Sequence, residues 1–272
     1  MKIFKLFLLI IISLVFSNQV FSEDKILESL KEGGKIIFIR HAYAPGGGDP
    51  ENFNKLNNSI IKCIKCKRLV NFRTKISIQK RKQFINEKYW GKPITGYGDT
   101  NGKILLVGLA PAAHGGNRTG RVFTGDKSSD FLYKCLHKVK IANQPNSDYL
   151  DDGLKLKNAF ITTALKCVPP EDKPLKEELD QCFKYFNQEI KFLKDLKVIV
   201  ALGKIAFDAC KYFYKSNYNF NENIKFEHNK VFKLPDNILL IGCYHPSPRN
   251  VNTGRINEKK MVQLFNRVLK LI

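Results

Sequence analysis

The chain has 272 residues, of which 43% are hydrophobic, so it can form one large domain or two small ones, and general disorder is excluded. Its 46 basic and 25 acidic side chains give a formal net charge of +21. Residues 1–54 carry six side chains of each sign, so the other 218 residues hold the whole excess. A basic domain of this size is typical of nucleic-acid binding, although lysine-rich codon usage explains part of the excess.

The first 22 residues have the pattern of a secretory signal peptide. Lys2 and Lys5 precede an apolar stretch at residues 6–16, and a cleavage-like pattern ends at Ser22. The apolar stretch is too short for a membrane span, so we expect no stable membrane partner.

A strand-like run followed by a glycine-rich loop carries Arg40 and His41. This segment resembles the start of the histidine phosphatases, in which an Arg-His motif supplies the histidine that is phosphorylated. The second histidine and the further arginines of that chemistry do not follow. We therefore expect residues 23–54 to be a vestigial fragment, and the alternative is an active phosphatase site.

From residue 55 onward, strand-like apolar runs alternate with helical patterns. A basic helical stretch is expected at residues 60–88. Strands are expected at residues 103–108, 159–164, 198–202 and 237–243, and further helices at residues 131–139, 176–195, 204–214 and 259–270. Such alternation predicts a central parallel sheet that is covered by helices on both faces.

Two glycine- and arginine-containing loops follow predicted strands and end in the same Thr-Gly-Arg tripeptide. The first loop covers residues 108–121 and the second covers residues 245–255. The carboxyl ends of parallel strands line the ligand crevice of an open sheet. Glycine lets backbone approach a ligand closely, and arginine supplies forked donors for anions. The two loops therefore predict a polar pocket with basic walls.

The seven cysteines fall into two groups. Cys63 and Cys66 form a CxxC motif, and Cys167 and Cys182 lie further along the chain. Together these four predict a site for zinc or an iron–sulfur cluster, whereas in an exported chain the CxxC would be a redox pair or a disulfide. The odd total argues against a disulfide framework. The other three have apolar neighbours and are expected in the core: Cys135, Cys210 and Cys243.

Taken together, the loops and cysteines resemble one family, the family 5 uracil-DNA glycosylases, which are iron–sulfur members of the uracil-DNA glycosylase superfamily. The resemblance covers residues 56–272 and rests on five segments in the same order: residues 63–70, residues 108–126, residues 163–170, Cys182 and residues 245–255. It implies a glycosylase domain at residues 55–272 with an α/β fold, a three-layer α/β/α sandwich around a short, mainly parallel four-stranded sheet.

The resemblance implies a DNA-repair enzyme that flips uracil out of DNA and hydrolyses the N-glycosidic bond, with other deaminated bases as further candidate substrates. It also implies a 4Fe-4S cluster with a structural role, with zinc as the other candidate occupant. The residues that match the cluster ligands are Cys63, Cys66, Cys167 and Cys182.

Further residues match the family's base and DNA contacts. Phe123 matches the aromatic residue that stacks on the flipped base, and His245 matches the catalytic histidine that donates to a uracil carbonyl oxygen. The first motif, whose backbone receives the base, corresponds to Gly108, Leu109, Ala110, Pro111 and Ala112. The residues expected to hold the DNA strand are Arg118, Arg121, Ser247, Arg249, Asn250 and Arg255.

Two carboxylates have open roles. The resemblance implies that Asp126 is a second catalytic residue, which positions the attacking water. The alternative is that Asp126 caps a helix that begins near Ser128. Asp172 is expected in the substrate site, at a position where the family favours asparagine, so the base preference stays open. His114 either contacts DNA or shapes its loop.

Two other classes of protein compete with this interpretation. One is a non-catalytic iron–sulfur or zinc protein that binds nucleic acid, and the other is an exported phosphatase-like protein. We expect instead a monomer that acts on DNA in the cytoplasm, at the bacterial nucleoid, a location with which the signal-like segment conflicts. The sequence leaves open the range of damaged bases and the strand preference.

Overall fold

The computed structural model describes residues 51–272. The signal-like segment and the Arg40-His41 motif lie outside these residues, so both stay predictions. Within residues 51–272, no helix is both long enough and apolar enough to cross a membrane.

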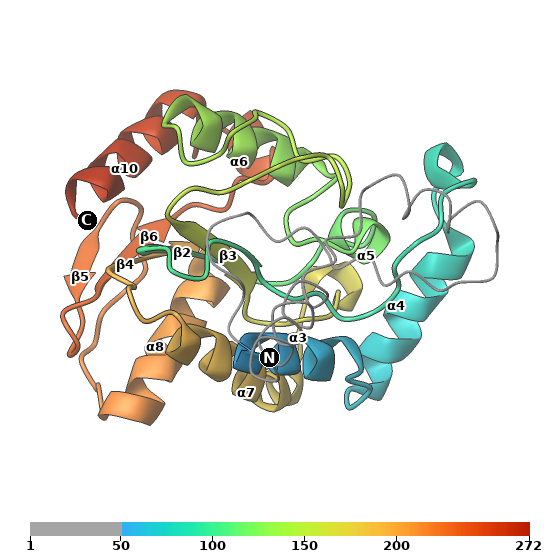
Figure 1. Cartoon of the computed structure of the whole chain (residues 1–272), viewed down its shortest axis with the longest axis horizontal. Helices are drawn as coiled ribbons and strands as arrows, with labels where there is room; N and C mark the ends of the chain where they lie inside the picture. Colours follow the sequence, from blue (N-terminus) through green and yellow to red (C-terminus); the bar gives the residue numbers. More distant parts are fainter. Residues whose placement is uncertain (1–50) are drawn as a thin grey trace, which may run out of the picture. The chain divides into compact units, whose positions relative to one another are not determined.

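A six-stranded sheet forms the centre of the described fold, with the strand order β1-β3-β2-β4-β6-β5 (Figure 1). Two edge strands, β1 (Tyr97–Gly98) and β5 (Val231–Lys233), run antiparallel to their neighbours. The prediction of four strands missed these two because they are only two and three residues long. The four middle strands are parallel, as predicted: β3 (Ala159–Thr163), β2 (Ile104–Gly108), β4 (Val198–Leu202) and β6 (Leu239–Cys243).

The middle strands form where they do because their side chains are buried on both faces. Strands β2, β3 and β4 are five-residue runs in which every residue is buried. Successive side chains of a strand point to opposite faces, so Leu106 enters one core and Leu105 enters the other. Continuous apolar runs of this kind are typical of parallel strands covered by helices on both sides.

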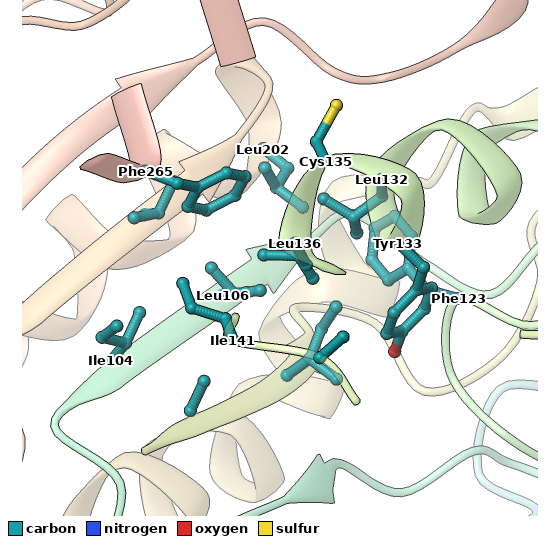
Figure 2. Close-up of a cluster of buried hydrophobic side chains, with 14 of the residues drawn as sticks. Ile104, Leu106, Phe123, Leu132, Tyr133, Cys135, Leu136, Ile141, Leu202 and Phe265 are labelled. Atoms are coloured by element: carbon teal, nitrogen blue, oxygen red, sulfur yellow. The ribbon is translucent and has the colours of Figure 1, made fainter. Parts of the chain in front are cut away.

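Helices α6 (Lys127–Lys138) and α10 (Glu258–Lys270) cover one face of the sheet (Figure 1). Leu132 of α6 and Phe265 of α10 belong to the same buried cluster as Leu106 of β2 (Figure 2). This packing fixes the start of α6 beside the end of β2, where the first motif loop runs.

Helices α3 (Glu51–Ile61), α7 (Lys176–Phe192) and α8 (Lys204–Tyr218) cover the other face. Phe53 of α3 is fully buried, and its ring centroid lies 5.4 Å from that of Phe160 in β3. Helix α3 therefore crosses residue 55, the predicted start of the glycosylase domain, and Phe53, which precedes that residue, lies in the same core. The division of the chain into domains otherwise stays a prediction.

The basic segment around the CxxC motif folds differently from the prediction. The prediction of a single helix over residues 60–88 was wrong. Helix α3 ends at Ile61, and a turn that carries the two cysteines separates it from α4 (Lys67–Gln79). Lys80 has a left-handed φ of 42°, which ends α4, and a short 3-10 turn, η1 (Lys82–Phe84), follows.

Candidate active site

The two motif loops meet at the carboxyl end of the sheet. The first loop follows β2 at Gly108, and the second follows β6 at Cys243. Strand β4 lies between these strands, so contact requires side chains that reach across it. Phe123 and His245 do so, with ring centroids 6.0 Å apart and an angle of 33° between the ring planes. The structure thus brings together the two rings that the sequence singled out.

Phe123 is held by close contact with a glycine. A Cβ atom on Gly108 would lie 2.6 Å from the Phe123 ring, so a larger residue there would displace the ring. Phe123 has a left-handed φ of 47°, a strained conformation for an aromatic residue, and its side chain lies at the margin of the core cluster (Figure 2). Strain of this kind persists only where the surrounding structure enforces it.

His245 lies over Gly203, at the end of β4. Its backbone carbonyl accepts a hydrogen bond from Asn250 Nδ2 at 2.9 Å, and Ser247 caps the short helix α9 (Pro248–Asn252) that follows. Burial lowers the pKa of His245 to about 4, so the ring is neutral at neutral pH. A neutral imidazole offers one N–H donor and one acceptor, and its tautomer decides which nitrogen donates.

A cavity of about 680 Å³ lies beside the first loop. Neither Phe123 nor His245 belongs to its lining. The predicted residues that line it are Ala112, His114, Arg118, Asp126 and Asp172. The first loop therefore borders the ring pair with one end and this cavity with the other.

The backbone of residues 108–112 is pinned to its neighbours. The carbonyl oxygens of Gly108 and Leu109 accept hydrogen bonds from the N–H groups of residues 164 and 165, which prolongs the pairing of β2 with β3. Ala110 packs against the cysteine site. Pro111 and Ala112 contact the short helix α5 (Gly116–Thr119).

Asp126 caps α6 and also faces the cavity. Its Oδ1 atom accepts hydrogen bonds from the backbone N–H groups of Ser128 and Ser129, at 2.8 and 3.0 Å, which confirms the capping interpretation. Its Oδ2 atom lies against Gly115 in the cavity wall. Burial raises the pKa of Asp126 above its ordinary value, although the two backbone donors act in the opposite direction. One carboxylate can thus cap the helix and present an oxygen to the cavity.

The four cysteines that match cluster ligands border one small cavity. Cys63 and Cys66 lie in the turn before α4, Cys167 follows β3, and Cys182 belongs to α7. All four are free thiols. Among residues 51–272, no group of three or more histidine, cysteine or carboxylate side chains is arranged to hold a single metal ion.

Two N–H donors point at these sulfurs. Arg73 Nη1 lies 3.4 Å from Cys167 Sγ, and the Lys166 backbone N–H donates to Cys182 Sγ at 3.3 Å. Burial and the neighbouring thiols raise the pKa of Cys167 to about 11 and that of Cys182 to about 12. These two N–H donors would stabilise negative charge on sulfur, which fits a group that binds sulfur as thiolate. The other three cysteines are buried in the core, as predicted: Cys135, Cys210 and Cys243.

A comparison with protein families assigns the fold and the motif loops to a known group. The model of the uracil DNA glycosylase superfamily matches residues 95–270, which include all six strands of the sheet and both motif loops. The chain belongs to the uracil DNA glycosylase superfamily.

Three relatives within the superfamily are similar to this chain over most of their length. The type-5 uracil-DNA glycosylase of Mycobacterium bovis is 38% identical over 218 residues, which are 80% of this chain and 81% of that protein. The type-5 enzyme of Thermus thermophilus is 38% identical over 210 residues, 77% of this chain and 93% of that protein. That of Pyrobaculum aerophilum is 36% identical over 210 residues, with shares of 77% and 89%.

Arg121 has a structural role in this member of the superfamily. Its side chain is buried, and all five of its N–H donors are used: by the hydroxyls of Thr124 and Ser147, the carbonyl of Leu150 and both oxygens of Asp152. The prediction that Arg121 holds a DNA phosphate was wrong, because no donor remains for a phosphate and the group is out of reach of one.

The other residues predicted to contact DNA differ in exposure. Arg118 is buried, donates to the carbonyls of His114 and Gly125, and borders the cavity, so its contact with DNA stays a prediction. Ser247 and Asn250 shape the second loop through the bonds described above. Arg249 and Arg255 are exposed on that loop, where a phosphate can reach them.

Asp172 lies on an unusual stretch of backbone. Its φ is 57° and that of Glu171 is 54°, so two successive residues are left-handed within η2 (Pro170–Asp172). Asparagine and aspartate tolerate this conformation better than other non-glycine residues. The backbone therefore explains why an Asp or an Asn suits this position, whatever its side chain does in the cavity.

Tyr149 is a cavity residue that the sequence analysis missed. It is 61% exposed at the cavity wall, and its backbone N–H donates to the same Asp152 carboxylate that binds Arg121. The only sequence signal is a lone aromatic residue in a polar loop, which no motif marks. The buried ion pair of Lys166 with Glu189 was also missed. Lys166 lies just after β3 and Glu189 lies on α7, 23 residues further along the chain, so only the fold brings them together.

Replacing Arg121 with Met would leave the Asp152 carboxylate buried without its partner. Because breaking a buried ion pair leaves an uncompensated charge, we expect the free energy of unfolding to fall by about 3–5 kcal/mol, measured by urea denaturation. Arg249→Met removes an exposed charge and is the control, with an expected change below about 0.5 kcal/mol. Equal and small effects of both changes would show that Arg121 is not structural.

Proposed function

We propose that this protein is a DNA-repair enzyme that removes uracil from DNA by hydrolysing its N-glycosidic bond and leaves an abasic site. Membership of the superfamily and the similarity to three type-5 uracil-DNA glycosylases support it. The observation that carries it is the pairing of a neutral, half-buried His245 with the fixed ring of Phe123 at the strand ends.

The base must leave the DNA stack before its sugar bond can be reached. Phe123 offers a flat apolar face on which an extruded pyrimidine can stack, at a low entropic cost because the ring is already immobile. Neutral His245 donates a hydrogen bond to a carbonyl oxygen of the base, and backbone groups of residues 108–112 border the same place. Other deaminated bases with a carbonyl in that position are also candidate substrates.

Cleavage of the bond moves its electron pair onto N1 of uracil and leaves positive charge on the sugar. A neutral N–H donor aimed at the base stabilises the departing uracil anion, and one such donor is typically worth about 3–4 kcal/mol. The exposed Arg249 and Arg255 hold the phosphates beside the lesion, and residues 248–253 enter the gap that the base leaves. Nearby phosphates in turn stabilise the positive sugar.

The attacking water gives its oxygen to C1′ of the sugar and a proton to a general base of the protein. We assign the role of general base to Asp126, which lines the cavity and whose Oδ1 atom caps α6 while Oδ2 lies beside Gly115. Its raised pKa makes it a better proton acceptor than an exposed carboxylate. Asp172, which also lines the cavity, is the residue we expect to influence which nucleobase is accepted.

We also propose that Cys63, Cys66, Cys167 and Cys182 hold a 4Fe-4S cluster. When bound, the cluster would cross-link the turn before α4, the segment after β3 and α7, and its role would be structural. Four cysteine sulfurs that line one small cavity would provide the thiolate ligands that such a cluster needs. We propose further that the protein acts as a monomer on chromosomal DNA in the cytoplasm.

His245→Ala removes the donor to the base. We expect the rate of uracil release from a labelled oligonucleotide to fall about 100- to 1,000-fold, while DNA binding is nearly unchanged. The exposed His137→Ala is the control and keeps the wild-type rate. Because the neutral ring is the active form and its pKa is about 4, titration of His245 leaves the wild-type rate unchanged as the pH falls through 6.5 and lowers it as the pH approaches 4. Undiminished release by His245→Ala would refute the role.

Asp126→Asn separates the two tasks of this side chain. Asparagine caps a helix about as well as aspartate, so the free energy of unfolding stays within about 0.5 kcal/mol of wild type, whereas Asp126→Ala costs about 1 kcal/mol. Loss of the proton acceptor lowers the single-turnover excision rate about 100- to 10,000-fold in Asp126→Asn. If Asp126→Asn excises uracil at the wild-type rate, the carboxylate is only a cap.

Iron analysis tests the cysteine site. The purified protein is expected to be brown and to contain about four irons and four inorganic sulfides per chain. Cys63→Ser loses most of this iron, whereas Cys210→Ala, which changes a buried core cysteine, keeps it. A colourless wild-type protein with one zinc per chain would contradict the cluster.

A further inference from the structure

Arg73 is a buried cation without a carboxylate partner. It belongs to α4, and 5% of its surface is exposed. Its Nη1 atom donates to Cys167 Sγ, Nη2 donates to the carbonyl of Cys63 at 3.3 Å, and Nε has no hydrogen-bond partner. Among the ion pairs formed within residues 51–272, none includes Arg73.

The other buried cations of the described fold differ in this respect. Arg121 pairs with Asp152, and Lys166 pairs with Glu189. On α4 itself, Arg68 pairs with Glu178 at 2.9 Å. An unpaired buried charge is strongly destabilising, so Arg73 requires a nearby negative group. The groups beside it that can carry negative charge are the cysteine sulfurs.

The backbone of Arg73 contacts the active-site loop. Asn117 of α5 is 1% exposed, and its Nδ2 atom donates to the carbonyl of Arg73 at 3.3 Å. The backbone N–H of Asn117 donates to the carbonyl of Ala112, and its own carbonyl accepts from Gly91. Asn117 therefore ties three segments together: α4, the first motif and the chain before β1.

We propose that Arg73 is the positioning residue that connects the cysteine site to the base pocket. Its guanidinium would offset the negative charge of the iron–sulfur group and donates to one of the sulfur ligands, Cys167, and its carbonyl anchors Asn117 and hence residues 112–118. This inference rests on the cluster proposed above. Filling the cysteine site then orders α4, and α4 orders the loop that borders the cavity.

Arginine suits this place better than lysine. Its planar fork reaches a sulfur and a carbonyl oxygen at once, and it is more weakly hydrated than an ammonium group, so it is buried at lower cost. A lysine keeps the charge and can satisfy only one of the two acceptors. The two substitutions therefore separate charge from hydrogen bonding.

The first experiment compares Arg73→Met, Arg73→Lys and Lys75→Met in the full-length protein. Lys75 is exposed on the same helix, so its replacement removes an equal charge away from the sulfurs. Arg73→Met is expected to retain iron about 10- to 100-fold more weakly against a chelator, and to shift the reduction potential of the cluster to a more negative value. Arg73→Lys keeps a near-wild-type potential, and Lys75→Met matches wild type in both measurements.

The second experiment uses Asn117→Ala, which breaks the contact with the Arg73 carbonyl and leaves the sulfurs alone. Its iron content and reduction potential stay at the wild-type values, while kcat/KM for uracil excision falls. Wild-type potential and iron retention in Arg73→Met would overturn the inference, as would full excision activity in Asn117→Ala. A wild-type protein without iron would instead contradict the cluster itself, so the two failures are distinguishable.

Discussion

A phenylalanine ring that packs against a glycine connects the two halves of the site. Gly108 ends β2 without a side chain, Phe123 fills that space in a left-handed conformation, and His245 faces the ring from across β4. Because the ring also packs on the core under α6, it cannot move without disturbing closely packed side chains. The end of the sheet therefore presents a fixed aromatic face and a neutral imidazole, which is the preorganisation that differential stabilisation of a departing base requires.

The cations behind the net charge of +21 include buried and exposed side chains, and the two groups have different roles. Arg121 and Lys166 are paired with carboxylates inside the fold, Arg73 faces the cysteines, and all three shape loops around the site. The exposed Arg249 and Arg255 lie on the second loop. Long-range attraction to DNA thus depends on exposed cations and weakens with salt, whereas the geometry of the pocket depends on buried ones.

The sequence predicts best what is encoded locally. The strand around Leu106 is recognisable because both of its faces are buried, and the cap at Asp126 because the polar residues that begin α6 are adjacent. The role of Arg121 was missed because its partner, Asp152, lies 31 residues away and only the fold brings them together. The edge strands and the break between α3 and α4 were missed for a related reason, since tertiary pairing and the cysteine turn override the local pattern there. His245 and Phe123 were found through a motif, not through periodicity.

Product analysis of the wild-type protein tests directly whether it excises uracil from DNA. The full-length chain, with its iron content measured in the same sample, is incubated with a duplex oligonucleotide that carries one uracil. A uracil-DNA glycosylase releases free uracil and leaves an abasic strand that alkali cleaves at the former uracil position. An iron-loaded protein that binds this duplex and releases no uracil would contradict the proposed function.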